Sequence, residues 1–311
     1  MSHGVSRRDF LKLTGAISAG MAAFGADVKL APQSLGTRSE GGVAWAQGAQ
    51  TYSLTCLEYA KVEKFPVSGM LYGAHNKGTA AIPFTYTLIK GGGRNILFDC
   101  GYANQKWNAV YGITDYEDPK TVLGKVGVSP EQIDTVIIGH MHFDHFGNTE
   151  AFPKAKIHIQ KSEMEGWVWA LGLGEDLKWI TAAVDPDDVI DAMKAAAEGR
   201  LVLVDGDQEI APGIKLINAN DTHTFGTQMA AVNTAKGTYC LTGDACYWYE
   251  NAEKMVPLGY AQGNQVTQLL SLKKAKDIAG GIDRLVPGHD AKVFEHNPSH
   301  MAGKNHVADL A

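Results

Sequence analysis

The sequence predicts a layered α/β fold, with helices on the outside of two packed sheets. Short runs rich in β-branched and aromatic residues recur along the chain, and helical patterns or glycine-rich turns separate them. Hydrophobic residues make up 45% and charged residues 20% of the 311 residues, which is typical of a globular protein with a sizeable core. No internal sequence repeat is evident.

Strands dominate the first half of the expected domain. Residues 64–83 contain three glycines and two prolines, and we expect a long loop there. Residues 119–127 predict a helix, and Ser129 before Pro130 predicts another helix start. The strands expected in this half are 51–62, the hairpin 84–90 with 95–99, and 156–160.

Helices and strands alternate in the second half. Residues 163–200 are expected to be mostly helical, and their tryptophans are either ordinary core or the apolar wall of a pocket. His158 is expected to be a structural histidine. The C-terminal residues 296–311 are expected to be largely solvated. The other expected elements are strands at 201–207, 214–219, 230–232, 239–242 and 284–286, and an amphipathic helix at 264–279.

The N-terminus resembles a twin-arginine export signal. Arg7 and Arg8 precede a weakly apolar stretch rich in alanine and glycine. The tripeptide 44–46 offers a cleavage site, so residues 1–46 are expected to be the signal peptide and residues 47–311 the folded domain. We therefore expect recognition by the twin-arginine export machinery and a periplasmic or secreted location. No apolar run of 18 residues follows, so stable membrane insertion is not expected.

Charge and cysteine content exclude some functions. The 28 basic and 34 acidic residues give a net charge of −6 with no long run of either sign, which argues against nucleic-acid binding. The cysteines, at 56, 100, 240 and 246, form no CxxC pair, so a zinc ribbon is excluded. A disulfide stays open in an oxidising compartment, although we expect Cys100, Cys240 and Cys246 to be buried thiols.

The strongest local signal is residues 134–147, which read DTVIIGHMHFDHFG. A β-branched run predicts a buried strand, and four metal-capable side chains follow within six residues: His140, His142, Asp144 and His145. Alternation at a strand tip projects His140 and His142 to the same side. The motif predicts a metal site in which one turn could serve two ions. The alternative is a polar loop that is rich in histidine by chance.

Three later residues complete the pattern. His223, Asp244 and His289 each lie just after an expected strand, where side chains from distant segments converge on a site. Asp244 alone is more typical of a turn residue, and each histidine alone would be ambiguous. Their joint occurrence at strand ends favours a shared metal centre.

In this combination the residues resemble the metallo-β-lactamase superfamily, whose pattern is HxHxDH followed by a His, an Asp and a His. The resemblance implies a four-layer αβ/βα sandwich over residues 47–311 and two Zn²⁺ or other divalent ions per subunit. By that resemblance, the first ion would be held by His140, His142 and His223, the second by Asp144, His145 and His289, and Asp244 would bridge them. Asp99 matches an early family Asp that supports the ligands.

Two short motifs are similar to those of N-acyl-homoserine lactone lactonases. HMHFDHFG at 140–147 matches their HxHFDHxG, and DACY at 244–247 matches their DAxY. The resemblance implies that a metal-bridging hydroxide opens a lactone ring, most favourably that of an N-acyl-homoserine lactone or a related lactone. Asp144 would orient the hydroxide with Asp244, and Tyr247 would manage the proton of the leaving oxygen. Two departures are Asp221-Thr222 in place of Pro-Gly and a longer 163–200 region.

Other functions of the same metal site remain open at this point. A phosphotriesterase-like or β-lactam hydrolase is the first alternative, although the lactamases lack the bridging Asp244. Nuclease members share HxHxDH, but the acidic chain does not suit phosphate contacts. Di-iron redox members place an acidic residue where His142 stands. A binding protein with structural metals and a homodimeric assembly are further open readings.

Overall fold

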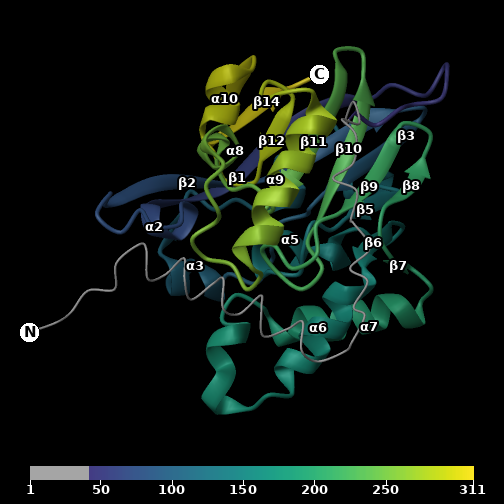
Figure 1. Ribbon diagram of the computed structural model, residues 1–311. Coiled ribbons are helices and arrows are strands. Elements are labelled where there is room, and N and C mark those ends of the chain that lie inside the picture. The colour runs from purple at the N-terminus through teal and green to yellow at the C-terminus, as the bar shows by residue number, and fades with distance from the viewer. Residues whose placement is uncertain (1–41) are drawn as a thin grey trace, which may run out of the picture. The chain divides into compact units, whose positions relative to one another are not determined.

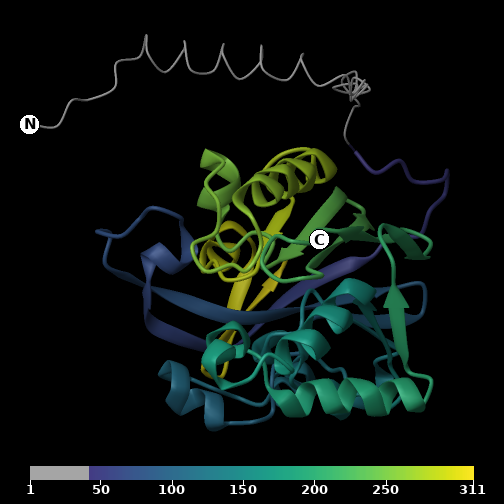
Figure 2. The same ribbon diagram turned by 60° about the horizontal axis from the view of Figure 1, so that its bottom comes forward.

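The structure is a computed structural model, which describes residues 42–311. Two β-sheets pack face to face, and helices cover their outer faces, so this part of the chain has four layers (Figures 1 and 2). The predicted α/β sandwich is confirmed. No helix among these residues is both long and apolar enough to cross a membrane.

The two sheets differ in size. The nine-stranded sheet has, in order across it, β13 (Ser299–Ala302), β14 (Asn305–Asp309), β1 (Ser53–Pro66), β2 (Thr79–Gly91), β3 (Arg94–Phe98), β5 (Thr135–Ile137), β6 (Lys156–Gln160) and β7 (Leu201–Val204), with β4 (Ile113–Thr114) also paired to β1. The five-stranded sheet has the order β12 (Leu285–Pro287), β11 (Gly237–Gly243), β10 (Gln228–Thr234), β9 (Ile214–Asn218) and β8 (Gln208–Ala211). In the larger sheet β3, β5, β6 and β7 run parallel, so their carboxyl ends meet at one edge.

Helices lie on both outer faces. In the first half these are α2 (Val67–Met70), α3 (Lys106–Tyr111), α4 (Pro119–Lys125), α5 (Phe143–Phe146) and the 3-10 turns η1 (Pro130–Gln132) and η2 (Thr149–Ala151). The second half holds α6 (Lys161–Leu171), η3 (Glu175–Thr181), α7 (Pro186–Ala197), α8 (Tyr249–Lys254), α9 (Gln265–Ala279) and α10 (Lys292–His296). α9 covers the smaller sheet, while α6 and α7 lie on the far side of the larger one (Figure 2).

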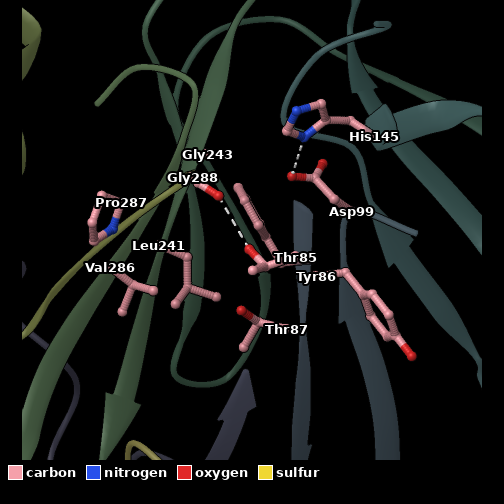
Figure 3. A pocket seen from close by; sticks show the side chains of 11 residues that line it. Thr85, Tyr86, Thr87, Asp99, His145, Leu241, Gly243, Val286, Pro287 and Gly288 are labelled. Atoms are coloured by element: carbon pink, nitrogen blue, oxygen red, sulfur yellow. Dashed lines mark hydrogen bonds and ion pairs between the residues drawn. The ribbon is translucent and has the colours of Figure 1, made fainter. Parts of the chain in front are cut away.

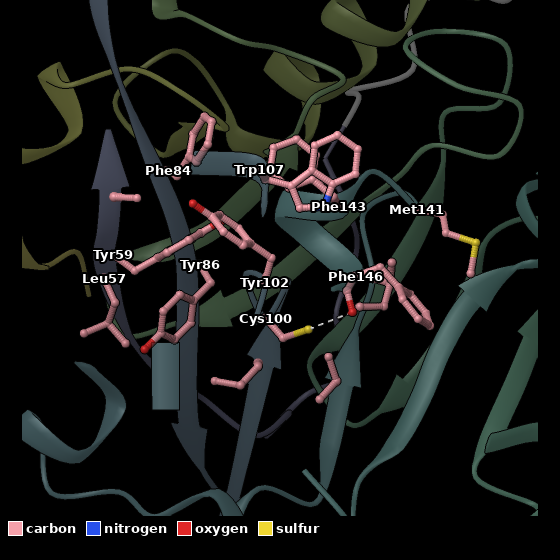
Figure 4. Packing of buried hydrophobic residues seen from close by; sticks show 14 of the residues in the cluster. Leu57, Tyr59, Phe84, Tyr86, Cys100, Tyr102, Trp107, Met141, Phe143 and Phe146 are labelled. Carbon is pink, nitrogen blue, oxygen red and sulfur yellow. Dashed lines mark hydrogen bonds between the residues drawn. The ribbon is translucent and has the colours of Figure 1, made fainter. Parts of the chain in front are cut away.

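Alternate side chains along β1 face two separate hydrophobic clusters, one on each side of the larger sheet. Leu57 and Tyr59 face the helices on the outer side of the larger sheet, whereas Leu54 and Cys56 face the smaller sheet. The outer cluster is rich in aromatic side chains (Figure 4). One of its members is Phe143 of α5, which anchors that short helix in the core. All four cysteines are free and buried, as expected for three of them.

Two expectations about irregular segments are wrong. Residues 64–83 are not one long loop, because β1 continues to Pro66, α2 follows, and β2 begins at Thr79. The C-terminal residues are solvated only in part, because β13 and β14 form a hairpin in which β13 is largely exposed, whereas β14 pairs with β1 and buries Val307 and Ala308. The expected helix start at Ser129 is only the 3-10 turn η1.

The predicted export signal falls almost entirely on residues 1–41, which lie outside the described part of the chain. Of the expected cleavage tripeptide, Trp45 donates a hydrogen bond from Nε1 to Oγ1 of Thr238 at 2.9 Å.

Candidate functional site

The seven residues predicted as metal ligands meet where strands of both sheets end. His140, His142, Asp144 and His145 follow β5, with the last two in the first turns of α5. His223 follows β9, Asp244 follows β11 and His289 follows β12. His142 is half-buried, and the other six are buried. The structure therefore brings together every ligand expected from the sequence.

The ligand atoms form two groups that share one carboxylate. In the first group His223 Nε2 lies 2.9 Å from His142 Nδ1 and 3.3 Å from Asp244 Oδ2, and His140 completes it. In the second group His145 Nε2 lies 3.3 Å from Asp144 Oδ2, and His289 completes it. Within each group the ligand atoms lie within 4.8 Å of one another.

Asp244 faces both groups with different oxygens. Its Oδ2 lies 3.7 Å from His140 Nε2, whereas its Oδ1 lies 3.1 Å from His289 Nε2 and 3.5 Å from His145 Nε2. Gly288 permits this approach, because a Cβ there would lie 2.5 Å from Asp244 Oδ1. Asp244 thus lies between the two groups and could serve both.

Unpartnered atoms in the cluster fit two divalent cations. Nε2 of His140, Nε2 of His145 and Oδ1 of Asp244 are buried and have no hydrogen-bond partner among residues 42–311. A buried polar atom without a partner costs about 1–3 kcal/mol, which coordination to a cation would remove. Five imidazoles and two carboxylates suit Zn²⁺ and similar ions.

The outward nitrogens of two ligands of the second group are held by the surrounding chain. Nδ1 of His145 lies 2.8 Å from Asp99 Oδ2, and Nδ1 of His289 lies 2.9 Å from the carbonyl oxygen of Pro83. Such contacts turn Nε2 of each ring toward the centre. Asp99 also accepts a hydrogen bond from the backbone N–H of Gly139 at 2.7 Å. Its φ of 60° is unusual for a residue other than glycine, as is common at functional sites.

A small cavity lies behind the Asp99–His145 pair (Figure 3). Its volume of about 10 Å³ is close to the lower limit for one water molecule. At its far side the hydroxyl of Thr85 donates to the carbonyl oxygen of Gly288 at 3.1 Å, which ties β2 to the loop that carries His289. The support of the second ligand group therefore comes from β2 and from the end of β3, both in the larger sheet.

Burial and neighbouring charges prepare the ligands for a cation. Burial lowers the pKa of His140 well below its usual value and that of His223 to about 4, so both imidazoles are neutral, as metal ligands must be. At His145 burial also lowers the pKa, but Asp144 and Asp244 outweigh it and raise the pKa well above the usual value. A metal ion held by the second group would therefore displace a proton from His145.

Tyr247 lies beside His223, on the Nδ1 side of its ring. Its hydroxyl donates to the carbonyl oxygen of Tyr260 at 2.7 Å and lies 2.9 Å from His223 Nδ1. Because the Tyr247 proton goes to Tyr260, the N–H must sit on Nδ1 of His223, which leaves Nε2 free to bind a metal. Burial raises the pKa of Tyr247 well above its usual value, so the hydroxyl keeps its proton.

An apolar cavity of about 380 Å³ opens beside the first ligand group. His142 and His223 form its inner end, and Gln262 ties its two sides together by donating to the carbonyl oxygen of Ile180 at 2.6 Å. The aromatic and aliphatic walls include Tyr111, Trp179, Ile180, Ala183 and Tyr260. Of the tryptophans in the helical region, Trp167 is core, whereas Trp179 belongs to the pocket wall.

A model of the metallo-beta-lactamase superfamily matches residues 85–289, which include all seven ligands. The chain belongs to the metallo-beta-lactamase superfamily. Its helical region between β6 and β7 and its Asp221-Thr222 pair leave the superfamily's ligand arrangement intact, with Asp221 at a φ of 55°.

Relatives within the superfamily include lactonases. The N-acyl homoserine lactonase of Bacillus cereus is 30% identical over 167 residues, which cover 53% of this chain and 59% of that protein. The match thus spans less than two thirds of the relative's length. A solved quorum-quenching N-acyl homoserine lactone lactonase is 24% identical, with a TM-score of 0.61 over 77% of this chain and 92% of its own. The dizinc quorum-quenching lactonase AidC is 16% identical, with a TM-score of 0.58 over 82% and 92%.

Sequence reasoning missed three residues that shape this superfamily site. The carbonyl of Tyr260 holds both His223 and Tyr247, and Gln262 closes the cavity wall. Glu163 is fully buried and accepts hydrogen bonds from Met141 and Thr224, which lie in two of the loops that carry ligands. The only sequence signal for Glu163 was its position in the first turn of an expected helix. Contacts made by a backbone carbonyl, such as that of Tyr260, leave no signal in the sequence.

Proposed function

We propose that this protein is a metal-dependent hydrolase that opens a lactone ring, with an N-acyl homoserine lactone or a related lactone as substrate. The observation that carries the proposal is the pair of ligand groups joined by Asp244 at the inner end of an apolar cavity. Divalent ions bound there would lower the pKa of a water molecule and polarise an ester carbonyl. The named activity of the lactonase relatives supports the same reaction class.

The cavity suits a substrate with one apolar and one polar end. An acyl chain would pack against Trp179 and Ile180 and exclude water, while the lactone would lie near His142 and His223. Holding the ester beside the ligand groups turns a bimolecular reaction into an intramolecular one. The preferred length of the substrate's acyl chain would then depend on the protein segment that carries Trp179.

The two carboxylates and Tyr247 would manage protons. Burial raises the pKa of Asp144, but His145 and His289 outweigh burial and hold it below its usual value, so Asp144 is ionised and accepts a hydrogen bond from the attacking water. Tyr247 keeps its proton and would donate it to the alkoxide that leaves when the ring opens. For that step its hydroxyl must exchange the carbonyl of Tyr260 for the leaving oxygen.

A panel of substrates tests the proposal. Purified chain loaded with Zn²⁺ is assayed with N-acyl homoserine lactones of several chain lengths, simple lactones, nitrocefin and a paraoxon-type phosphotriester. We expect turnover of lactones, and we expect His142→Ala to abolish it because the variant removes a ligand of the first group. Turnover of only the phosphotriester or only nitrocefin would refute the lactonase assignment in favour of the corresponding alternative.

We also propose that the protein is exported through the twin-arginine route. The proposal is supported by the paired Arg7 and Arg8 ahead of an apolar stretch. Replacing both arginines by lysine should retain the precursor in the cytoplasmic fraction, whereas the unchanged chain should be processed near residue 46. Equal distribution of both proteins between fractions would contradict the export route.

A further inference from the structure

Glu163, in the first turn of α6, is a fully buried carboxylate whose two oxygens are both saturated. Its Oε1 accepts hydrogen bonds from the backbone N–H of Met141 at 2.7 Å and from Nε1 of Trp167 at 2.7 Å. Its Oε2 accepts from the hydroxyl of Thr224 at 2.8 Å and from the backbone N–H of Gly226 at 2.6 Å. No Lys or Arg among the described residues pairs with it, so these four donors alone satisfy its oxygens.

The donors belong to the loops that carry the first ligand group. Met141 lies between His140 and His142, and Thr224 directly follows His223. The carboxylate therefore links the loop after β5 to the loop after β9, which are separated by about eighty residues of chain. The side chains of the second ligand group make no hydrogen bond with Glu163.

The backbone of α6 and that of the loop after His223 are in close contact around Glu163. A Cβ at Gly226 would lie 2.3 Å from the backbone nitrogen of Glu163, so the loop after His223 rests directly on α6. A Cβ at Gly166 would likewise lie 2.3 Å from the ring of Phe225. If hydrogen bonds at Glu163 are lost, we therefore expect the loop after β5 or the loop after β9 to move.

We propose that Glu163 is a positioning residue that sets the separation between His223 and the His140–His142 pair, and with it the affinity of the first ligand group for its metal ion. The inference rests on the proposed metal site but not on the identity of the substrate. Removal of groups that orient metal ligands typically weakens metal binding by about 10–100-fold.

Glu163→Gln is the sharpest variant, because it keeps the size of the side chain. A carboxamide has one oxygen, so in either orientation its NH₂ faces one pair of donors. If it faces Met141 and Trp167, two N–H groups lose their acceptor. If it faces the other pair, the Thr224 hydroxyl can rotate and accept, but Gly226 cannot.

The experiment is a Co²⁺ titration of metal-free protein, followed by visible absorption and by metal content per chain. We expect the unchanged protein to take up two ions, and we expect Glu163→Gln to bind one of them about 10–100-fold more weakly while the other keeps its affinity. The matched control is Glu58→Gln. Glu58 is also a buried carboxylate, which accepts from the backbone N–H of His306 at 2.8 Å, away from both ligand groups. Its variant should retain both affinities.

Thr224→Val serves as a milder variant if Glu163→Gln fails to fold. It keeps the side-chain shape and removes one of the four hydrogen bonds to Glu163, together with the 3.0 Å contact between the hydroxyls of Thr224 and Thr227. The same ion should therefore be weakened by a smaller factor. Unchanged affinities in both variants, or equal weakening of both ions, would overturn the role of Glu163. Two bound ions without lactone turnover would refute the proposed substrate alone, and an unchanged protein that binds no Co²⁺ would refute the metal site and this inference together.

Discussion

The Tyr247→Phe variant distinguishes a structural role of the Tyr247 hydroxyl from its proposed role as a proton donor. The variant removes the donor to Tyr260 and the contact with His223, and it leaves the ring in place. His223 Nδ1 still lies 3.2 Å from the carbonyl oxygen of Tyr260, so the imidazole keeps its orientation and the metal site should survive. Loss of one hydrogen bond should lower the free energy of unfolding by about 1 kcal/mol. Loss of a proton donor to the leaving oxygen should lower kcat by about 10²–10⁴-fold.

Leaving-group basicity provides the assay. A thiolactone releases a thiolate, whose conjugate acid has a pKa of only about 8.5 and needs little help from a proton donor. Tyr247→Phe should therefore reduce kcat for the oxygen lactone far more than for the matching thiolactone, at unchanged metal content. Tyr239→Phe is the control, because Tyr239 is a buried tyrosine that donates to the carbonyl of Leu310 at 2.8 Å, remote from the ligands. An equal decrease in kcat for both substrates would refute the role of Tyr247 as a proton donor. So would a loss of bound metal that by itself accounts for the whole decrease in activity.

Three further predictions address stability and specificity. Burial, reinforced by Asp185, raises the pKa of Asp188 to about 8, so the folded chain holds a proton that the unfolded chain releases. Stability in urea should therefore fall between about pH 4 and pH 8, by at most about 1.4 kcal/mol per pH unit, and Asp188→Asn should flatten that slope; equal slopes would contradict the assignment. Ala183→Phe should fill the cavity and raise KM for long-chain lactones more than for short ones, and a uniform change would argue against acyl binding there. Removing metal with a chelator should lower Tm and abolish turnover, and Zn²⁺ should restore both; an unaffected Tm would contradict a stabilising role for the ions.

The meeting of the seven candidate ligands could be predicted from the sequence because they are side chains in a recognisable order. His140 to His145 follow a β-branched run, and a buried parallel strand must end where its polar residues begin. Asp99 was also identifiable as a support for a ligand, and it holds His145. In these cases the information lies within a few residues of the chain.

The remaining parts of the site depend on contacts between distant segments. Glu163 acquires its role only when the loops after β5 and β9 meet, and no local pattern records that meeting. The C-terminal strand β14 was missed for a related reason. Its five residues alternate too briefly to predict a strand, and their stability comes from pairing with β1, whose partner residues lie some 250 positions earlier.

The helical segment between β6 and β7 is separable from the two ligand groups. It supplies Trp179 and Ala183 to the cavity and contributes no metal ligand, so exchange of residues 172–185 is a route to new substrate ranges. Several tethers limit that freedom. The carbonyl oxygen of Ala183 accepts from the backbone N–H of Phe143, the residue between His142 and Asp144, at 2.9 Å, and the carbonyl oxygen of Ile180 accepts from Gln262 at 2.6 Å. Asp185 in turn accepts from Asn104 at 3.1 Å. A replacement segment that preserves these contacts can change the lining of the cavity without altering the two ligand groups.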